Sequence, residues 1–299
     1  MRIDPNIVPD ILSDLQQSQV SLDTALQQVS TGKSVNVPSD NPAASAEMVQ
    51  NTIETGDVDQ YTQNVSTALS TVQSASSVLS SVVTSLTQAV SLGTEGANGT
   101  NSTANLQTIT AQVEGILSSV VSLANTSVGG QFLFGGTGTT TPYTADSTSP
   151  TGYTYNGNND INSVDVGDQT SVQVNLPGNQ IFSNPSNNVL GSLSSLVTAL
   201  KGGNGSDIQT ATAAVDSALN FVGQQQVVYS NSETRLNSQE TFLQQDTVTL
   251  STQANNLIGV NEATAATNLS QAETDNSAAL AAAAKVLPNS LLNYLEPPT

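Results

Sequence analysis

The chain contains no cysteine and no histidine among its 299 residues. These two side chains are the ones most often used as thiol nucleophiles, as general bases near pH 7 and as ligands of zinc or iron. Most enzyme mechanisms therefore lack their central residue, and we expect no catalytic site, no metal site and no cofactor. Without cysteine there are also no disulfides, so the fold must be stabilised by burial or by assembly.

Positive charge is scarce as well, with five Lys and Arg against 24 Asp and Glu. Nucleic-acid binding needs clustered Lys and Arg, so this class of function is excluded. No stretch approaches the roughly 20 apolar residues of a spanning helix, so we expect no membrane insertion. The segment Met1–Asp10 lacks the apolar run of a cleaved signal peptide, so export would need another route.

Uncharged polar residues replace the missing charge: the chain has 39 Ser, 36 Thr, 29 Asn and 25 Gln. In the first half, apolar residues recur at alternating spacings of four and three. This pattern predicts a long helix from near Pro42 to near Gly93, a Gly/Asn/Thr-rich turn, and a second helix packed antiparallel to the first. The predicted core residues of this hairpin are Tyr61, Val65, Val72, Leu79, Leu86, Val113 and Val120.

The second half repeats an apolar residue at every seventh position over eight heptads, starting at Ile208. The pattern predicts a helix of about 50 residues. Because isolated helices with few ion pairs are marginal, we expect all these helices to form one bundle. The further predicted core residues are Val215, Val222, Tyr229, Leu236, Leu243, Leu250 and Leu257.

The segment between the helical halves is rich in Gly, Asn, Thr, Tyr and Pro. Alternating runs at Ser163–Val166 and Ser171–Leu176 predict small strands, so we expect a β-rich insertion that buries little and is dispensable for assembly. The predicted fold class is mainly α, a bundle of long coiled-coil helices with a small β-rich insertion. The expected parts are an amino-terminal assembly helix (1–39), a helical hairpin (40–128), the insertion (129–188), a long bundle helix (189–258) and a carboxyl-terminal assembly helix (259–299).

Both ends of the chain carry a short amphipathic stripe. A lone short helix at a terminus frays, so we expect these two helices to become ordered against each other or against neighbouring subunits. The predicted subunit-assembly residues are Ile11, Leu15, Leu22, Val29, Leu280, Leu287, Leu291, Leu292 and Leu295.

The segment between the first two helices carries residues typical of helix ends. Gly32 can end one helix in a left-handed conformation, and Asp40 or Asn41 can cap the next helix, with Pro42 in its first turn. A phosphate loop would need several glycines before Lys33, and these are missing. The acidic turn at 158–168 lacks the spaced glycine and terminal glutamate of an EF-hand calcium loop.

Several segments resemble the flagellins and flagellin-like hook-associated proteins of bacterial flagella. Gln28–Ala44 resembles the amino-terminal signature of that family, and Gln60–Asn64 the start of its long helix. Gly96–Thr100 is similar to the hairpin turn, and Leu123–Thr126 with Phe132–Gly136 to the exit into the variable region. The chain departs from the family pattern at Ser34, where a second basic residue is usual, and at Pro5 and Pro9, which we expect to break the first turn of the terminal helix.

Within this family, Pro38–Pro42, Phe132–Gly136 and Ser290–Leu295 are more similar to the hook-associated members than to the flagellins. The resemblance implies an extracellular structural adaptor at the hook-filament junction, secreted by the flagellar export apparatus. Its implied partners are hook-associated protein 1, flagellin, copies of itself in a ring and a flagellar export chaperone. The alternatives are a flagellin filament subunit, a surface adhesin that binds through the insertion, and an enzyme.

Overall fold

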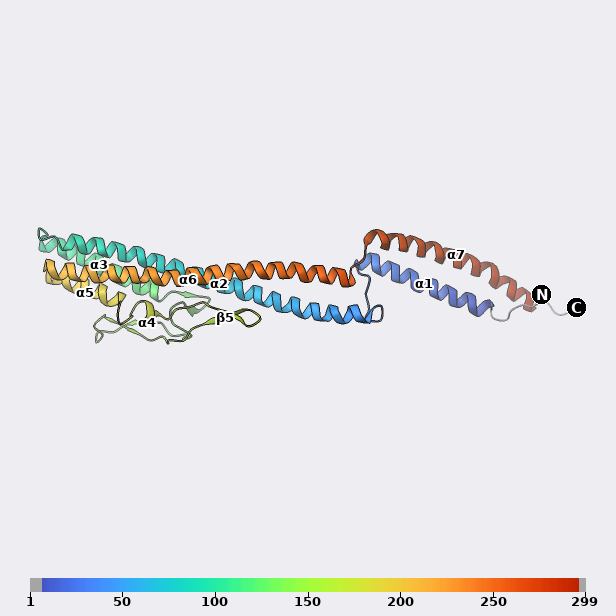
Figure 1. The fold of residues 1–299 in the computed structure, drawn as a ribbon, viewed down its shortest axis with the longest axis horizontal. Helices are drawn as coiled ribbons and strands as arrows, with labels where there is room; N and C mark the ends of the chain where they lie inside the picture. The colour runs from blue at the N-terminus through green and yellow to red at the C-terminus, as the bar shows by residue number, and fades with distance from the viewer. Residues whose placement is uncertain (1–6, 296–299) are drawn as a thin grey trace. The chain divides into compact units, whose positions relative to one another are not determined.

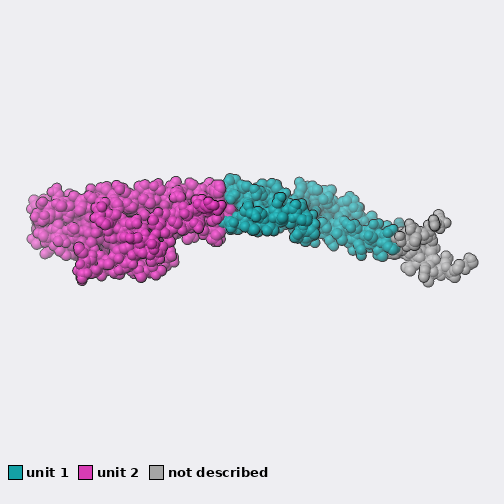
Figure 2. Space-filling view, turned by 60° about the horizontal axis from the view of Figure 1, so that its bottom comes forward, with its two compact units in different colours: residues 1–57, 245–299 teal, residues 58–244 magenta. Residues whose placement is uncertain are grey.

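The structure, a computed structural model, describes residues 7–295, with side chains for residues 9–285. The chain forms two compact units, one made of Met1–Asp57 with Gln245–Thr299 and the other of Val58–Gln244 (Figure 2). We call them unit 1 and unit 2. The elements are α1 (Ile7–Thr31), α2 (Pro42–Gly96), α3 (Thr103–Ala124), β1 (Ser127–Val128), β2 (Gln131–Phe132), β3 (Tyr143–Ala145), β4 (Tyr153–Tyr155), β5 (Ser163–Gly167), β6 (Thr170–Gln173), α4 (Gly178–Ile181), α5 (Val189–Gly202), α6 (Gly205–Ile258) and α7 (Glu262–Leu295).

The predicted fold class, mainly α with long bundle helices and a small β insertion, is confirmed (Figure 1). Helix α2 begins where the sequence predicts it, because the Asn41 side chain accepts a hydrogen bond from the Ala44 N–H (3.1 Å) and Pro42 opens the first turn. Helix α3 is capped by Ser102, whose hydroxyl accepts from the Asn105 N–H. The two helices predicted for the hairpin are therefore both present, and each begins at a side-chain cap.

Helix α1 differs from the prediction at its start. It runs from Ile7 through Pro9, although Pro9 was expected to break the first turn. Proline is tolerated there because the first N–H groups of a helix have no partner within the helix. Pro5, the other proline named for this break, lies outside the described residues.

The predicted heptad residues form a large part of the core of unit 2. On α2 and α3, the side chains of Val65, Val72, Leu79, Leu86, Val113 and Val120 are all buried. On α6, the buried heptad residues within unit 2 are Val215, Val222, Tyr229, Leu236 and Leu243. Tyr61 is half-buried; in unit 1, Leu250 is buried and Leu257 is half-buried. Each full burial contributes on the order of 1.5–3 kcal/mol relative to exposure, so these seams supply most of the driving force for the bundle.

A glycine lets three helices meet closely at one end of the bundle. A Cβ placed on Gly93 of α2 would collide with the Thr212 hydroxyl of α6 and come within 3.2 Å of the Leu196 side chain of α5. Helix α5 ends at Gly203, which has a left-handed conformation (φ +70°) and donates its N–H to the Ala199 carbonyl. The Gly-rich break before the long helix α6 is therefore a helix stop.

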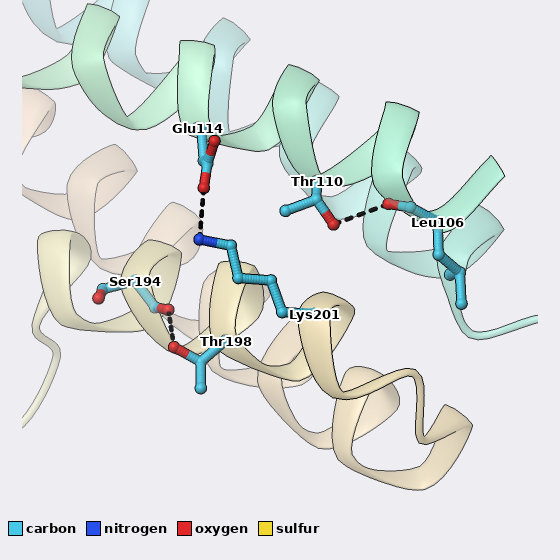
Figure 3. A network of polar contacts seen from close by, with 6 residues as sticks. All are labelled: Leu106, Thr110, Glu114, Ser194, Thr198 and Lys201. Carbon is cyan, nitrogen blue, oxygen red and sulfur yellow. Dashed lines mark hydrogen bonds and ion pairs between the residues drawn. The ribbon is translucent and has the colours of Figure 1, made fainter. Parts of the chain in front are cut away.

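Helices α3 and α5 pack against each other and are joined by an ion pair. The Lys201 ammonium of α5 lies 2.7 Å from the Glu114 carboxylate of α3 (Figure 3). Both side chains are substantially exposed, so the pair adds little stability. On the same helices, the hydroxyls of Thr110 and Thr198 donate to carbonyls four residues earlier in their own helix.

The insertion consists of three separate antiparallel strand pairs, β1–β2, β3–β4 and β5–β6. Strands β5 and β6 form where the alternating runs predicted strands, with a register shift between Asp165 and Gly167. The expectation that this region buries little is wrong. Phe134 and Phe182 are fully buried and meet edge to face, with ring centroids 5.2 Å apart, and Tyr143 packs on Phe182. These aromatic side chains give the insertion a core of its own.

One described helix, α2, is long and apolar enough to cross a membrane by length and composition alone. About a third of the relevant window is buried in the bundle. A core helix passes the same test, so this single helix is weak support for a membrane span.

Replacement of Leu236 by Ala tests the seam. Leu236 is fully buried, so we expect Leu236→Ala to lower the free energy of unfolding by roughly 2–5 kcal/mol, as large-to-small core substitutions do. Phe242 on the same helix is 62 % exposed, so Phe242→Ala should change the free energy of unfolding by less than about 1 kcal/mol. Urea unfolding followed by circular dichroism measures both. Similar losses for the two variants would contradict the assignment of the core.

Candidate assembly surfaces

The terminal helices α1 and α7 pack against each other in unit 1 (Figure 1). The fully buried side chains of this pair are small: Ala25 on α1 and an alanine series on α7. Large aliphatic side chains are missing from this buried set among residues 9–285. The α7 alanines that are buried are Ala265, Ala272 and Ala283.

Two polar side-chain oxygens are also buried in unit 1, Oγ of Ser18 on α1 and Oδ1 of Asn276 on α7. Neither has a hydrogen-bond partner among the described residues. A buried polar atom without a partner lowers stability. The pairing of α1 with α7 is therefore weaker than that of the bundle helices.

The predicted assembly residues with described side chains divide between this seam and the exposed surface. Ile11, Leu15 and Leu22 are half-buried, whereas Val29 and Leu280 are 44 % and 49 % exposed. Leu12 and Leu26, which the sequence analysis did not single out, are 48 % and 46 % exposed on α1. The remaining predicted residues, Leu287, Leu291, Leu292 and Leu295, have side chains outside the described residues.

The connector after α1 contains the predicted helix stop and helix cap. Gly32 has φ +67° and donates its N–H to the Gln28 carbonyl, which ends the helix. The Asp40 carboxylate then accepts hydrogen bonds from the N–H groups of Asn36 and Val37, both at 3.0 Å. Asp40 therefore closes a turn, and the cap of α2 falls to Asn41.

Where α2 and α6 meet in unit 1, a polar residue occupies a buried position. Asn51 is 5 % exposed, and its amide donates to the Leu250 carbonyl (3.0 Å) and to the Gln253 side chain (3.4 Å). The sequence analysis missed Asn51 because it counted only apolar residues. A buried amide must be paired to be tolerated, and this one is.

The insertion is tied to the bundle by polar contacts within unit 2. The backbone N–H of Leu176 donates to the Tyr229 hydroxyl at 2.9 Å. The Asn64 side chain donates to the Asp165 carbonyl at 2.8 Å, and Arg235 donates to the Ser171 carbonyl at 3.2 Å. Burial raises the pKa of Tyr229 well above its usual value, so its hydroxyl stays protonated. Tyr229 is thus both a heptad residue and an anchor of the insertion.

Titratable groups of the insertion serve local structure. Hydrogen bonds from the Thr148 and Thr154 side chains lower the pKa of Asp146 to about 2. Burial raises the pKa of Tyr143 and of Tyr155, and the Tyr155 hydroxyl donates to the Phe134 carbonyl. Each of these groups already has partners that account for its position.

The described residues contain no group of three or more Asp and Glu that could hold a metal ion. One cavity of about 260 Å³ lies between α2 and the insertion. Its walls are uncharged, with amides such as Gln131 and Asn162 above apolar side chains such as Val164 and Val174. This lining offers neither a nucleophile with a base nor a charged anchor for a cofactor.

The chain was compared with protein families and with solved structures. Residues 9–139 match the family model of the bacterial flagellin N-terminal helical region. The matched stretch is less than half of the chain, so the comparison shows similarity to a flagellin helical region over these residues. The resemblance to the flagellins and flagellin-like hook-associated proteins, expected from the sequence, is thereby confirmed. The matched stretch contains the end of α1 at Gly32, the whole of α2 and α3, and the start of the insertion at Phe134.

The fold is shared with solved flagellar proteins. A putative flagellar hook-associated protein from Vibrio parahaemolyticus has a TM-score of 0.68 at 21 % identity, covering 74 % of this chain and 100 % of its own. Bacillus cereus FlgL has a TM-score of 0.60 at 20 % identity, covering 69 % and 99 %. The flagellar junction protein FlgL from Legionella pneumophila has a TM-score of 0.60 at 13 % identity, covering 71 % and 100 %. No curated protein sequence matches the chain.

The anchor at Tyr229 can be tested by removing one oxygen atom. Tyr229→Phe leaves the buried Leu176 N–H without its acceptor, so we expect a loss of roughly 1–3 kcal/mol in the free energy of unfolding. Tyr61→Phe is the control, because Tyr61 is only half-buried and its hydroxyl has no partner among the described residues. Thermal unfolding of both variants gives the comparison. Equal small effects would mean that the bond to Leu176 contributes nothing.

Proposed function

We propose that the protein is a structural component of the bacterial flagellum, the adaptor that joins the hook-associated protein 1 layer to the flagellin filament. The observation that carries this proposal is the shared fold, which spans nearly the whole length of solved flagellar hook-associated and junction proteins. The flagellin helical region over residues 9–139 supports the same assignment. Its partners would be hook-associated protein 1, flagellin, copies of itself in a ring and an export chaperone.

The proposed role is packing and not catalysis. The sequence has no histidine or cysteine, and the cavity beside the insertion has uncharged walls. What the chain does offer is aliphatic surface on its terminal helices, at Leu12, Leu26, Val29 and Leu280. Exposed aliphatic residues of this kind are what neighbouring subunits can bury on assembly. The protein would act outside the cell, after secretion by the flagellar export apparatus.

A flagellin filament subunit is the second candidate, favoured by the match to the flagellin helical region. Immunogold labelling of flagellated cells separates the two. We expect label confined to the boundary between hook and filament, because an adaptor is needed only there. Label along the whole filament would replace the adaptor by a filament subunit, and label on the cell body alone would contradict both.

A pair of charge substitutions separates folding from assembly. Leu250 is buried, so Leu250→Asp places a carboxylate in the core and should unfold unit 1, at a cost of several kcal/mol. Leu280 is about half exposed in the single chain, so Leu280→Asp should leave the melting temperature within a few degrees of the original. It should nevertheless abolish incorporation, because a neighbouring subunit would have to bury the charge.

Thermal melts and a motility assay of the same variants measure these two effects. Leu280→Met is the control, since it keeps an apolar side chain of similar volume and should stay motile. A large fall in melting temperature for Leu280→Asp would show that this residue packs within the chain. Normal motility with Leu280→Asp would remove it from the assembly surface.

A further inference from the structure

The two connectors of unit 1 meet in a short antiparallel bridge between Lys33 and Gly259. The Ser34 N–H donates to the Ile258 carbonyl at 2.6 Å, and the Ser34 hydroxyl donates to the same oxygen at 3.0 Å. In return, the Val260 N–H donates to the Gly32 carbonyl at 3.1 Å. We call these three hydrogen bonds the connector clasp.

The clasp joins three helix ends. Ile258 is the last residue of α6, so no N–H group of the helix donates to its carbonyl, which needs a donor from elsewhere. Ser34 supplies that donor from 224 positions away in the sequence. Gly32 follows the last residue of α1, and Val260 lies two residues before α7. The clasp therefore caps α6 and holds the end of α1 beside the start of α7.

The pairing of α1 with α7 needs such a constraint, because its seam is poorly specific. The fully buried contacts are alanines, and the larger Leu15, Leu22 and Leu269 on the same faces are only half-buried. Helix α7 also carries further alanines on other faces, for example at 278, 281 and 282. Small side chains of equal size define no unique interdigitation, unlike large ones in a coiled coil. The seam also buries oxygens of Ser18 and Asn276 without a partner. A shift of α1 along α7 would cost little in such a seam.

The chain between α1 and α2 is long enough to permit that shift. Residues 32–41 separate the two helices, and ten extended residues span on the order of 33 Å. A slip of one heptad moves a helix by only about 10 Å. The length of the connector therefore does not fix the register of α1 on α7. The clasp lies where α1 ends and α7 begins, so it is placed to fix that register.

We propose that Ser34 is a positioning residue: through the Ile258 carbonyl it fixes the register of α1 on α7, and thus presents the terminal helices in one alignment. The inference concerns the folding of the chain itself. Its consequence for incorporation into the flagellum rests on the proposed function. A ring of identical subunits needs identical terminal helices, so a mixture of registers would hinder assembly even when every helix is formed.

The absence of cysteine makes the register directly measurable. Thr24 of α1 and Asn268 of α7 line the same groove, so Thr24→Cys with Asn268→Cys places one spin label on each helix. Pulsed electron resonance on the purified full-length chain then gives the distribution of label distances. With Ser34 in place, we expect one narrow distance.

The variants of Ser34 differ in how many hydrogen-bond donors residue 34 offers to the Ile258 carbonyl. Ser34→Ala removes the hydroxyl donor and should lower the ratio of aligned to shifted chains roughly two- to tenfold, the effect of one hydrogen bond. Ser34→Pro removes the N–H donor as well and should leave a broad distribution. Ser34→Thr keeps both donors and should restore the narrow distance. Ser30→Ala is the control, since Ser30 is an exposed serine of α1 outside the clasp.

Either of two results would overturn the proposal. One is a single narrow distance in Ser34→Pro, which would mean that the alanine seam alone sets the register. The other is a broad distribution with Ser34 intact, which would mean that the clasp does not align the helices. Neither result depends on where the protein acts in the cell. The spin-label distances can behave as expected while immunogold labelling finds no protein at the hook-filament boundary. In that case the clasp stands and the proposed function fails.

Discussion

Burial of an apolar seam along each long helix is the interaction on which the rest of the structure depends. With five Lys and Arg in 299 residues, the helices cannot be supported by many ion pairs. Their surface hydroxyls, such as those of Thr62 and Thr71, donate to carbonyls four residues back in the same helix. Such bonds slightly destabilise a helix. Helices of 55 and 54 residues therefore persist only because Val72, Leu79 and their equivalents are buried against partners.

This dependence explains why the bundle could be predicted from the sequence. A seam that must be continuous leaves a regular spacing, and Val65, Leu79 and Leu236 stand in it where burial requires apolar side chains. The helix ends could be predicted because Asn41 with Pro42 and Gly203 carry local signals for starting and stopping. What the spacing does not reveal is a polar residue that belongs to the seam. Asn51 and the Tyr229 hydroxyl gain their partners only in three dimensions.

The insertion was predicted in outline, since the strands near 163–173 alternate, but its stability was underestimated. Its core is built by Phe134 and Phe182, which are 48 positions apart, and by Tyr143 between them in the sequence. Phe134 and Phe182 lie outside the strands, so no periodic pattern marks them as buried. The three strand pairs are separate, and each is too small to be stable alone. The aromatic core and the anchor at Tyr229 stabilise them together.

Helix α7 shows the limit of periodicity most clearly, because it has two apolar faces and only one can lie inside the chain. The pattern favoured the larger residues, such as Leu280, yet the structure buries Ala272 and Ala283 and leaves Leu280 half exposed. Close approach of two helices over alanines removes little apolar area, while at about 25 cal/mol per Å² an exposed leucine still has much of its burial energy to gain. Folding of the single chain therefore uses the alanine face of α7 and leaves Leu280 open. A helix pair built in this way is marginal alone and would gain stability from a partner that covers its exposed leucines. Under the proposed function, this would couple the final ordering of the chain to its assembly.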